Sequence, residues 1–297
     1  SRADVIIEAI FENLEAKQEL FKKLEGQVKP DAILATNTSA IPLKDIASVL
    51  DKPDRLIGLH FFNPVAKMPL VEVVYDEDTG QEEIDRGAAF CNQINRFPLP
   101  VVSSPGFLVN RVLAKYMLKA FQIHRERNVP KEALDKAAEL FGMPVGPVEL
   151  VDNVGLDVVL HVAEVLGAET EGPVAEQLRK MVDSGKLGRK SGQGFYDWSD
   201  GKAAKPPCDS STVPADIEDR LVLAMVNEAV SCLTDAVVSD PDLLDAGVIF
   251  GTGFAPFRGG PINYARERGV DEVRSRLEQL AEAHGERFAP HPGWSDL

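Results

Sequence analysis

The sequence predicts an α/β domain followed by two related all-helical domains. Three observations predict this order: apolar runs alternate with amphipathic stretches in the first part, helical patterning follows, and the last segment repeats the one before it. We expect the domains to span residues 1–103, 104–205 and 206–297, with the last one structural.

In the first domain, near-continuous apolar runs are typical of buried strands in a parallel sheet with helices on both faces. Apolar residues at helical spacing, broken by glycine and proline, mark the helices between them. The predicted strands are 5–10, 32–36, 56–62, 70–75 and 99–103, and the predicted helices are 14–24, 42–50 and 83–97. Together they indicate an open α/β sheet.

After Pro105 the pattern becomes helical. The expected helices are 107–127, 131–141, 155–166, 174–182 and, in the third domain, 217–238. A glycine-rich segment at 185–198 ends the second domain, and the composition of 199–212 is typical of a linker.

The third domain matches the second at fixed offsets. Arg111 matches Arg220, and Phe141-Gly142 matches Phe250-Gly251, both at an offset of 109; beyond a five-residue shift, 146–159 matches 260–273. Two copies are too few for a solenoid. We therefore expect two helical domains packed face to face, as the subunits of a symmetric dimer pack.

Charge and composition exclude several classes of function. A net charge of −15 argues against a nucleic-acid or anionic-membrane surface, which needs clustered Lys and Arg. No run of about 18 apolar residues and no signal peptide is present. We expect a soluble cytoplasmic protein, or a mitochondrial or peroxisomal one if it is eukaryotic.

The cysteines and histidines indicate neither disulfides nor a metal. Cys91, Cys208 and Cys232 have long spacings and form no Cys-x-x-Cys motif, which suits a reducing compartment. No two of the five histidines have the spacing of metal ligands, so no metal site is expected.

Polar residues follow the predicted strands, where α/β folds bind their ligands. His60 lies in the strand 56–62 and Glu72 in the middle of the strand 70–75. A turn between these strands would bring the carboxylate beside the imidazole and stabilise its protonated form, so the pair is a candidate general base.

Each of these residues also has a plain structural interpretation. His60 can be a buried, hydrogen-bonded histidine with an unrelated Glu72. The Asn-Thr-Ser string at 37–39 can be a polar turn that caps the next helix, and Asn110 can satisfy backbone groups early in a helix. No Gly-x-Gly-x-x-Gly turn follows a strand, and neither a Walker loop nor a His-Glu-x-x-His motif is present.

Six strings are informative as a set. They are VIIEAIFENLEAKQ (5–18), ILATNTSAIPL (33–43), GLHFFNPVAKMPLVEVV (58–74), SPGFLVNRVL (104–113), FGMPVGPVELVDNVGLDV (141–158) and GRKSGQGFYDW (188–198). Together they resemble the 3-hydroxyacyl-CoA dehydrogenase family, in particular that portion of the multifunctional α-subunit of fatty-acid β-oxidation. The string FGTGFAPFRGGPINY (250–264) resembles the second helical copy of the multifunctional form.

The resemblance implies NAD as the cofactor, a 3-hydroxyacyl-CoA as the substrate, and roles for the catalytic residues. His60 is then the base that takes the proton of the 3-hydroxyl as hydride leaves C3, and Glu72 supports its positive charge. Ser39 and Asn110 hydrogen-bond the substrate's oxygens. A thiolase subunit and a second copy of the chain are the implied protein partners.

The same resemblance assigns contacts to the cofactor. Asn63 lies beside it, Glu12 and Lys17 match positions near the nicotinamide ribose and the bound ligands, and Lys190 matches a cofactor-contacting lysine. The expected first domain is the C-terminal part of a Rossmann-type dinucleotide-binding domain, because the family's first strand and glycine-rich turn, and the multifunctional form's hydratase domain, have no match before Ala3.

A chain without that turn is expected to retain the catalytic residues and bind NAD poorly. Charge-assisted hydrogen bonds contribute roughly 1.5–3 kcal/mol each, and several hold a pyrophosphate. Two alternatives stay open at this point. One is a non-catalytic assembly or dimerisation module, and the other is a related β-hydroxyacid dehydrogenase.

Overall fold

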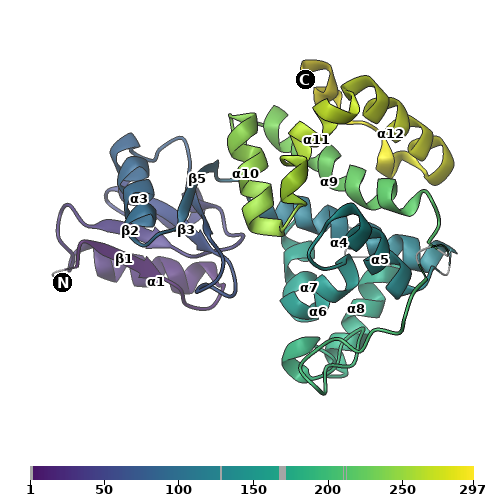
Figure 1. Ribbon diagram of the computed structural model, residues 1–297. Coiled ribbons are helices and arrows are strands. Elements are labelled where there is room, and N and C mark those ends of the chain that lie inside the picture. The colour runs from purple at the N-terminus through teal and green to yellow at the C-terminus, as the bar shows by residue number, and fades with distance from the viewer. Residues whose placement is uncertain (1–2, 128, 167–171, 210, 212) are drawn as a thin grey trace.

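The computed structural model describes residues 3–127, 129–166, 172–209, 211 and 213–297. A sheet module occupies the N-terminal part, and two sets of helices form the rest, with the second set reaching back to the sheet (Figure 1). This arrangement confirms the predicted fold class of an α/β sheet followed by an all-helical part. Within the described ranges, no helix combines the length and hydropathy that a bilayer crossing requires.

The sheet has five strands in the order β1-β2-β3-β4-β5. The strands are β1 (Val5–Glu8), β2 (Ile33–Thr36), β3 (Leu56–Phe61), β4 (Leu70–Tyr75) and β5 (Phe97–Val102). Neighbouring strands are parallel except β3 and β4, which are antiparallel. The expectation of a wholly parallel sheet was therefore wrong at this pair, whose strands are connected by residues 62–69 without an intervening helix.

Alternate strand residues face two apolar layers. On one face Leu34 packs with α1 (Leu14–Glu25) and α2 (Leu43–Ala47). On the other face Ile57 packs under α3 (Gln81–Gln93), where Gly87 lies so close that a β-carbon would meet the Ile57 side chain at 2.6 Å. Both faces of the sheet are thus covered, as the apolar runs predicted.

The helical part contains nine α-helices among its described residues. They are α4 (Val109–Arg127), α5 (Lys131–Phe141), α6 (Pro147–Val154), α7 (Leu156–Val165), α8 (Pro173–Asp183), α9 (Ile217–Thr234), α10 (Pro241–Thr252), α11 (Pro261–Arg268) and α12 (Val270–His284). The first five follow β5 directly, and α9 to α12 form the second set.

Several boundaries differ from the prediction. The first strand ends at Glu8 rather than residue 10, and α3 ends at Gln93, so that Phe97 opens a strand instead of closing a helix. Helix α6 was not expected, because eight residues are too few for a clear helical period. Gly155, at φ 104°, ends α6 and begins α7.

In each helical set, an aspartate of one helix caps the N-terminus of the next helix. Asp135 of α5 accepts hydrogen bonds from the first backbone N–H groups of α6, and Asp245 of α10 does the same for α11. Gly146 and Gly260 precede these helices, and a β-carbon at either position would collide with the aspartate. The structure therefore supports a repeat of helices, which remains a proposal as a domain division.

The paired helices show where the predicted repeat register fails. Phe141 is buried, whereas its expected counterpart Phe250 is 41% exposed and packs its ring 5.4 Å from that of Phe97 in the sheet. Helix α10 ends at Thr252 and is one residue longer than α5. The aspartates therefore correspond at an offset of 110 instead of 109.

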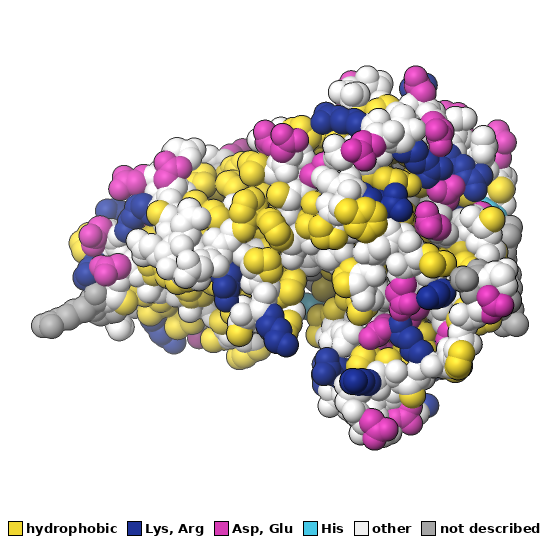
Figure 2. All heavy atoms as spheres, viewed as in Figure 1, with side chains coloured by type: hydrophobic (Ala, Val, Ile, Leu, Met, Phe, Trp, Pro, Cys, Tyr) yellow, Lys and Arg dark blue, Asp and Glu magenta, His cyan; other side chains and the backbone are white. Residues whose placement is uncertain are grey.

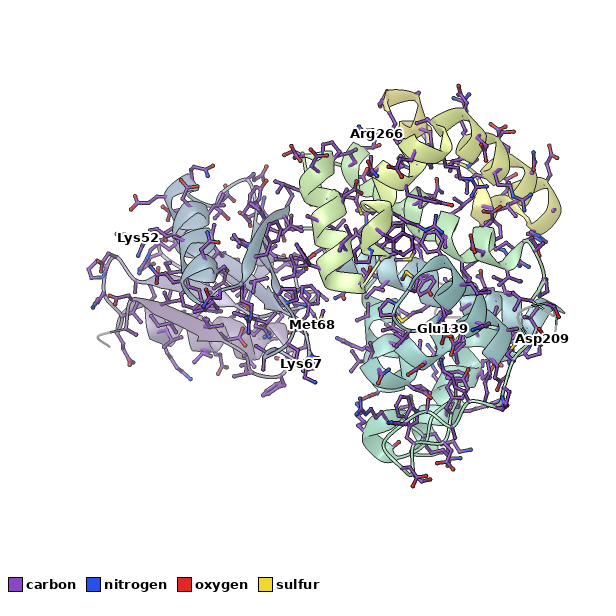
Figure 3. The ribbon with its side chains drawn as sticks, in the orientation of Figure 1. Lys52, Lys67, Met68, Glu139, Asp209 and Arg266 are labelled. Atoms are coloured by element: carbon purple, nitrogen blue, oxygen red, sulfur yellow. The ribbon has the colours of Figure 1, made fainter. Side chains whose placement is uncertain are left out.

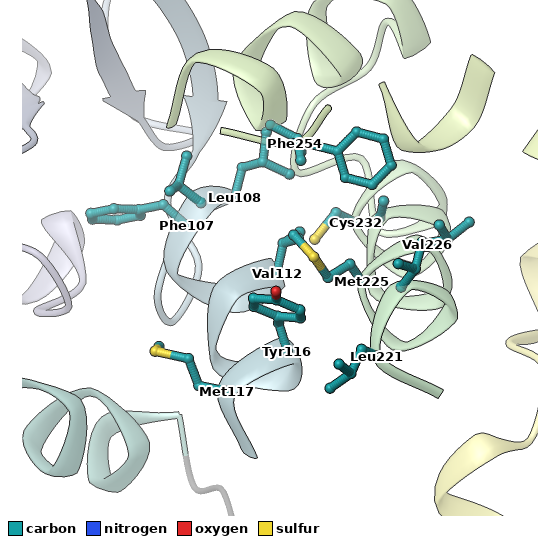
Figure 4. Packing of buried hydrophobic residues seen from close by; sticks show 14 of the residues in the cluster. Phe107, Leu108, Val112, Tyr116, Met117, Leu221, Met225, Val226, Cys232 and Phe254 are labelled. Carbon is teal, nitrogen blue, oxygen red and sulfur yellow. The ribbon is translucent and has the colours of Figure 1, made fainter. Parts of the chain in front are cut away.

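Helices α4 and α9 form the seam between the two sets. Val112 and Tyr116 of α4 point towards Leu221 and Met225 of α9 (Figure 4). All four side chains are fully buried. This seam agrees with the expected face-to-face packing of the two helical sets.

Candidate active site

His60 and Glu72 form a buried pair across two strands. They are opposite each other in the β3–β4 register, and His60 Nδ1 lies 2.6 Å from Glu72 Oε2. Glu72 is fully buried and His60 is 5% exposed. With Nδ1 held by the carboxylate, Nε2 is the ring nitrogen left for a proton of a ligand.

The start of α4 holds the second oxygen of the carboxylate. Glu72 Oε1 accepts hydrogen bonds from the backbone N–H groups of Leu108 at 3.1 Å and Val109 at 3.0 Å. The chain enters this helix through Gly106 and Phe107, whose φ angles are 73° and 51°. A carboxylate at a helix N-terminus is stabilised by the donors and the dipole there.

Aromatic side chains surround the imidazole. The rings of Phe62 and Phe107 lie 4.6 Å and 5.5 Å from that of His60, both edge-on. These rings limit the access of water, which strengthens the interaction between His60 and Glu72. The molecule is hollowed where the sheet meets the helical part, and apolar side chains gather beside the hollow (Figure 2).

Glu12 and Lys17 belong to a polar cluster beyond the end of β1. Lys17 is 1% exposed, and its Nζ lies 2.8 Å from Glu8 Oε1 and 3.2 Å from Glu12 Oε2. Burial alone would raise the pKa of Glu12, but the Thr38 hydroxyl and Lys17 outweigh burial and lower this pKa. The Lys17 charge is therefore already balanced within the protein.

The loop after β2 is tied to this cluster and to β3. Ser39 donates its backbone N–H to Glu12 Oε1 at 2.9 Å, and Asn37 Oδ1 accepts from the Phe61 N–H at 2.9 Å. Both side chains are half-buried. Ser39 therefore follows the carboxyl end of β2, and His60 lies near the carboxyl end of the neighbouring parallel strand β3.

Asn110, Asn63 and Lys190 occupy three different places. Asn110 is half-buried at the second position of α4, directly after the N–H group that binds Glu72. Asn63 is exposed in the turn between β3 and β4, and Lys67 and Met68 of that turn lie at the end of the sheet that faces the helices (Figure 3).

Lys190 lies in the helical part. Its Nζ is 2.5 Å from Asp157 near the start of α7, and among the described contacts none joins it to His60. The structure therefore brings His60 and Glu72 together and places Ser39 and Asn110 on elements that meet them. It does not bring Lys190 to this group.

Comparison with known proteins decides the family. Residues 1–104 match the model of the NAD binding domain of 3-hydroxyacyl-CoA dehydrogenase, and residues 106–198 match the model of its C-terminal domain. The solved (S)-3-hydroxybutyryl-CoA dehydrogenase of Ralstonia eutropha is 39% identical, with a TM-score of 0.60, and the match covers 65% of this chain and 70% of that one. The chain belongs to the 3-hydroxyacyl-CoA dehydrogenase family.

Two further relatives match almost the whole chain. The fatty acid oxidation complex subunit alpha of Vibrio vulnificus is 41% identical over 306 residues, which are 99% of this chain and 43% of the relative. The solved 3-hydroxybutyryl-CoA dehydrogenase of Escherichia coli K12 is 26% identical with a TM-score of 0.84, covering 99% of this chain and 81% of that one. The chain thus spans less than half the length of the curated relatives it matches.

The family resemblance read from the six strings is confirmed, and NAD is the cofactor of this dehydrogenase family. The residues beyond β1 fit such a group. Phe11 and Ile10 are 71% and 40% exposed and form an apolar ledge, beside the partly exposed Glu12 carboxylate. An apolar surface with a few fixed polar groups is the usual lining of a cofactor site.

Sequence reasoning missed the groups that hold the site in place. Val102 at the end of β5 donates its N–H to Val237 O, which follows α9, at 2.9 Å. Gly251 of α10 lies against Val109, where a β-carbon would be 2.5 Å from the valine Cγ2, and Gly247 lies equally close to Leu99. The string Gly-Val-Ile-Phe-Gly at 247–251 is the signal that could have indicated this close approach.

Proposed function

We propose that this chain carries out the NAD-dependent oxidation of L-3-hydroxyacyl-CoA to 3-ketoacyl-CoA in fatty-acid β-oxidation. The observation that supports it is the buried contact of 2.6 Å between His60 Nδ1 and Glu72 Oε2, in a chain of this family. A histidine held by a buried carboxylate is the usual arrangement of a general base.

His60 takes the proton of the 3-hydroxyl at Nε2. The positive charge that arises on the imidazole is balanced by Glu72, whose carboxylate is aligned by the helix N–H groups of Leu108 and Val109. NAD, when bound, supplies the hydride acceptor for C3. In the reverse direction the same imidazolium returns the proton to the 3-keto oxygen.

Ser39 and Asn110 position the substrate. Both are half-buried, and they lie on the loop after β2 and on the first turn of α4. We propose that they hydrogen-bond the oxygens of the substrate, so that C3 is held over the cofactor. Such positioning is the main contribution of a protein to cofactor chemistry.

The structure changes the way in which two of the proposed cofactor contacts would act. Glu12 and Lys17 shape the surface beside the cofactor and do not bind it through a free charge, because Lys17 is paired with both Glu12 and Glu8. Asn63 is exposed and available at the turn after β3. Lys190 is paired with Asp157 in the helical part, and its contact with the cofactor stays a proposal.

The wider setting is also proposed. The names of the curated relatives support a subunit of a fatty acid oxidation complex. We also propose a thiolase subunit as a partner, self-association of the chain, and a soluble cytoplasmic location. We further propose that the 297-residue polypeptide binds NAD weakly, because it contains no Gly-x-Gly-x-x-Gly turn after a strand to hold the pyrophosphate.

Separate calorimetric titrations test these proposals. The purified 297-residue polypeptide is titrated with acetoacetyl-CoA and, independently, with NADH. Binding of the thioester with weak binding of NADH supports both proposals. Tight NADH binding with turnover would refute only the weak-binding proposal, whereas binding of neither ligand would favour an assembly module over an enzyme.

A further inference from the structure

The loop after β2 contains an asparagine that the proposed mechanism does not use. Asn37 is half-buried and directly follows Thr36, the last residue of β2. Its side-chain Oδ1 accepts a hydrogen bond from the backbone N–H of Phe61 at 2.9 Å. This contact joins the loop after β2 to the residue that follows His60 in β3.

The contact lies where β3 extends beyond its parallel neighbour. The register between β2 and β3 ends at the pair of Thr36 and Gly58. His60 and Phe61 lie beyond that pair, although on their other side both stay paired with β4. The Asn37 side chain therefore supplies an acceptor to β3 on the side where β2 has ended.

The hydrogen bond holds the peptide group that follows the α-carbon of His60. The N–H of Phe61 and the carbonyl of His60 belong to one planar peptide unit, so an acceptor on this N–H restricts how His60 is oriented. Glu72 is held separately, by the N–H groups at the start of α4. The two partners of the 2.6 Å contact thus depend on different supports, and Asn37 is a support on the histidine side.

The turn after β2 does not require the Asn37 side chain. Thr38 Oγ1 accepts hydrogen bonds from the backbone N–H groups of Ala40 at 3.3 Å and Ile41 at 2.9 Å. The backbone N–H of Asn37 is bound by the carbonyl of Glu8 in β1, at 2.8 Å. The side chain of Thr38 therefore satisfies the turn, whereas that of Asn37 is directed to β3.

We propose that Asn37 is a positioning residue, which holds His60 in line with Glu72 and with the substrate. This inference rests on the proposed function of His60 as the base. Without Asn37 Oδ1 the end of β3 loses its acceptor on one side, and a displacement of about 1 Å can lower a reaction rate about 10²-fold. The proposal assigns the effect to the Oδ1 acceptor and not to the Nδ2 donor.

Kinetics of two variants at this position separate positioning from ligand binding. Asn37→Ala should lower kcat with acetoacetyl-CoA about 10–10²-fold at NADH concentrations raised until the rate saturates, and change KM for either ligand less than about three-fold. Asn37→Asp keeps an oxygen acceptor for the Phe61 N–H and removes the amide donor. Its kcat should therefore stay within a few-fold of the wild type.

Asn227 of α9 provides the matched control for lost stability. Like Asn37 it is half-buried, and its Oδ1 accepts a backbone N–H, that of His291, at 2.9 Å. Asn227→Ala removes a contact of the same kind within the second helical set. The variant should unfold at a lower temperature than the wild type and keep its kcat.

A spectroscopic readout needs neither turnover nor NAD. The proton of a short hydrogen bond between an imidazole and a carboxylate gives an NMR signal at low field, and loss of the signal in His60→Gln assigns it to this pair. Asn37→Ala should weaken or remove the signal. Asn37→Asp and Asn227→Ala should retain it.

These measurements distinguish failure of the positioning role from failure of the proposed function. The positioning role is overturned if Asn37→Ala retains the low-field signal or the kcat of the wild type, if it raises KM for NADH without lowering kcat, or if Asn37→Asp is as impaired as Asn37→Ala. A wild-type protein with the signal and no turnover would contradict the proposed function alone. The signal in the Asn37 variants would then decide whether this side chain positions His60.

Discussion

The two helical sets resemble each other, but the first turns of their long helices, α4 and α9, contact different partners. The first N–H groups of α4 hold Glu72 of the sheet. Near the start of α9, Asp219 instead accepts hydrogen bonds from Arg268 at 2.6 Å and Arg276 at 2.7 Å within its own set. The same helix end therefore supports a candidate catalytic carboxylate in one set and an internal ion cluster in the other.

This difference supports the proposal that the second set has a structural role and carries no catalytic residue. Its α10 helix nevertheless packs on Leu70 of β4 and on Val109 of α4, through Gly251. The second set thus packs against both the start of α4 and β4, the strand that carries Glu72. Four pairs of substitutions test the comparison, from the largest expected effect to the smallest.

The largest effect is expected at the histidines. His60→Gln removes the proposed base, so kcat with acetoacetyl-CoA, at NADH concentrations raised until the rate saturates, should fall about 10²–10⁴-fold. His284 is the matched control, because its Nε2 lies 3.2 Å from Asp216 Oδ2 in the second set. His284→Gln should leave kcat within a few-fold of the wild type, and equal losses in both variants would contradict the assignment of chemistry to the first set.

The next pair of variants compares Asn110 with Asp219, which correspond at the offset of 109. Asp219→Ala leaves Arg268 and Arg276 without their shared carboxylate, so the free energy of unfolding should fall by about 1.5–3 kcal/mol while kcat is retained. Asn110→Ala should reduce kcat/KM and leave the free energy of unfolding nearly unchanged. Urea unfolding and steady-state kinetics on both proteins would show whether the two effects separate in this way.

The sequence predicted most of the sheet and the proximity of His60 to Glu72, because period, glycine and proline breaks and strand spacing are local signals. It did not predict the N–H groups that hold Glu72, since backbone donors carry no side-chain signature. Helix α6 was missed because its eight residues give no clear helical period, and its start is fixed by Asp135, a residue of another helix. The register of the repeat failed for a related reason, because one added residue in α10 changes which side chains face the core.

Gly251→Ala tests the mechanical contribution of the second set. The added β-carbon would lie 2.5 Å from Val109 Cγ2, and the stiff valine side chain has little freedom to move away. Overpacking at this contact should cost about 1–3 kcal/mol of stability and lower kcat by moving the start of α4. Gly26→Ala is the control, since nothing lies within 4 Å of a β-carbon there, and its kcat should be unchanged.

The smallest effect concerns the pH dependence of stability. Burial raises the pKa of Asp245 to about 6, from 3.8 in an unperturbed carboxyl. Because the folded protein holds this proton more tightly than the unfolded chain, the contribution to stability is largest below pH 4 and is lost as the pH rises through about 6.

Asp245→Asn removes this titration, so the difference in the free energy of unfolding between variant and wild type should change by about 1–2 kcal/mol across this range, water screening part of the effect. Asp135, which caps α6 as Asp245 caps α11, has Lys205 at 3.4 Å, and this cation opposes the rise in pKa that burial causes. Asp135→Asn should therefore alter the pH dependence less, and an equal or larger change in that variant would show that Lys205 does not distinguish the two capping aspartates.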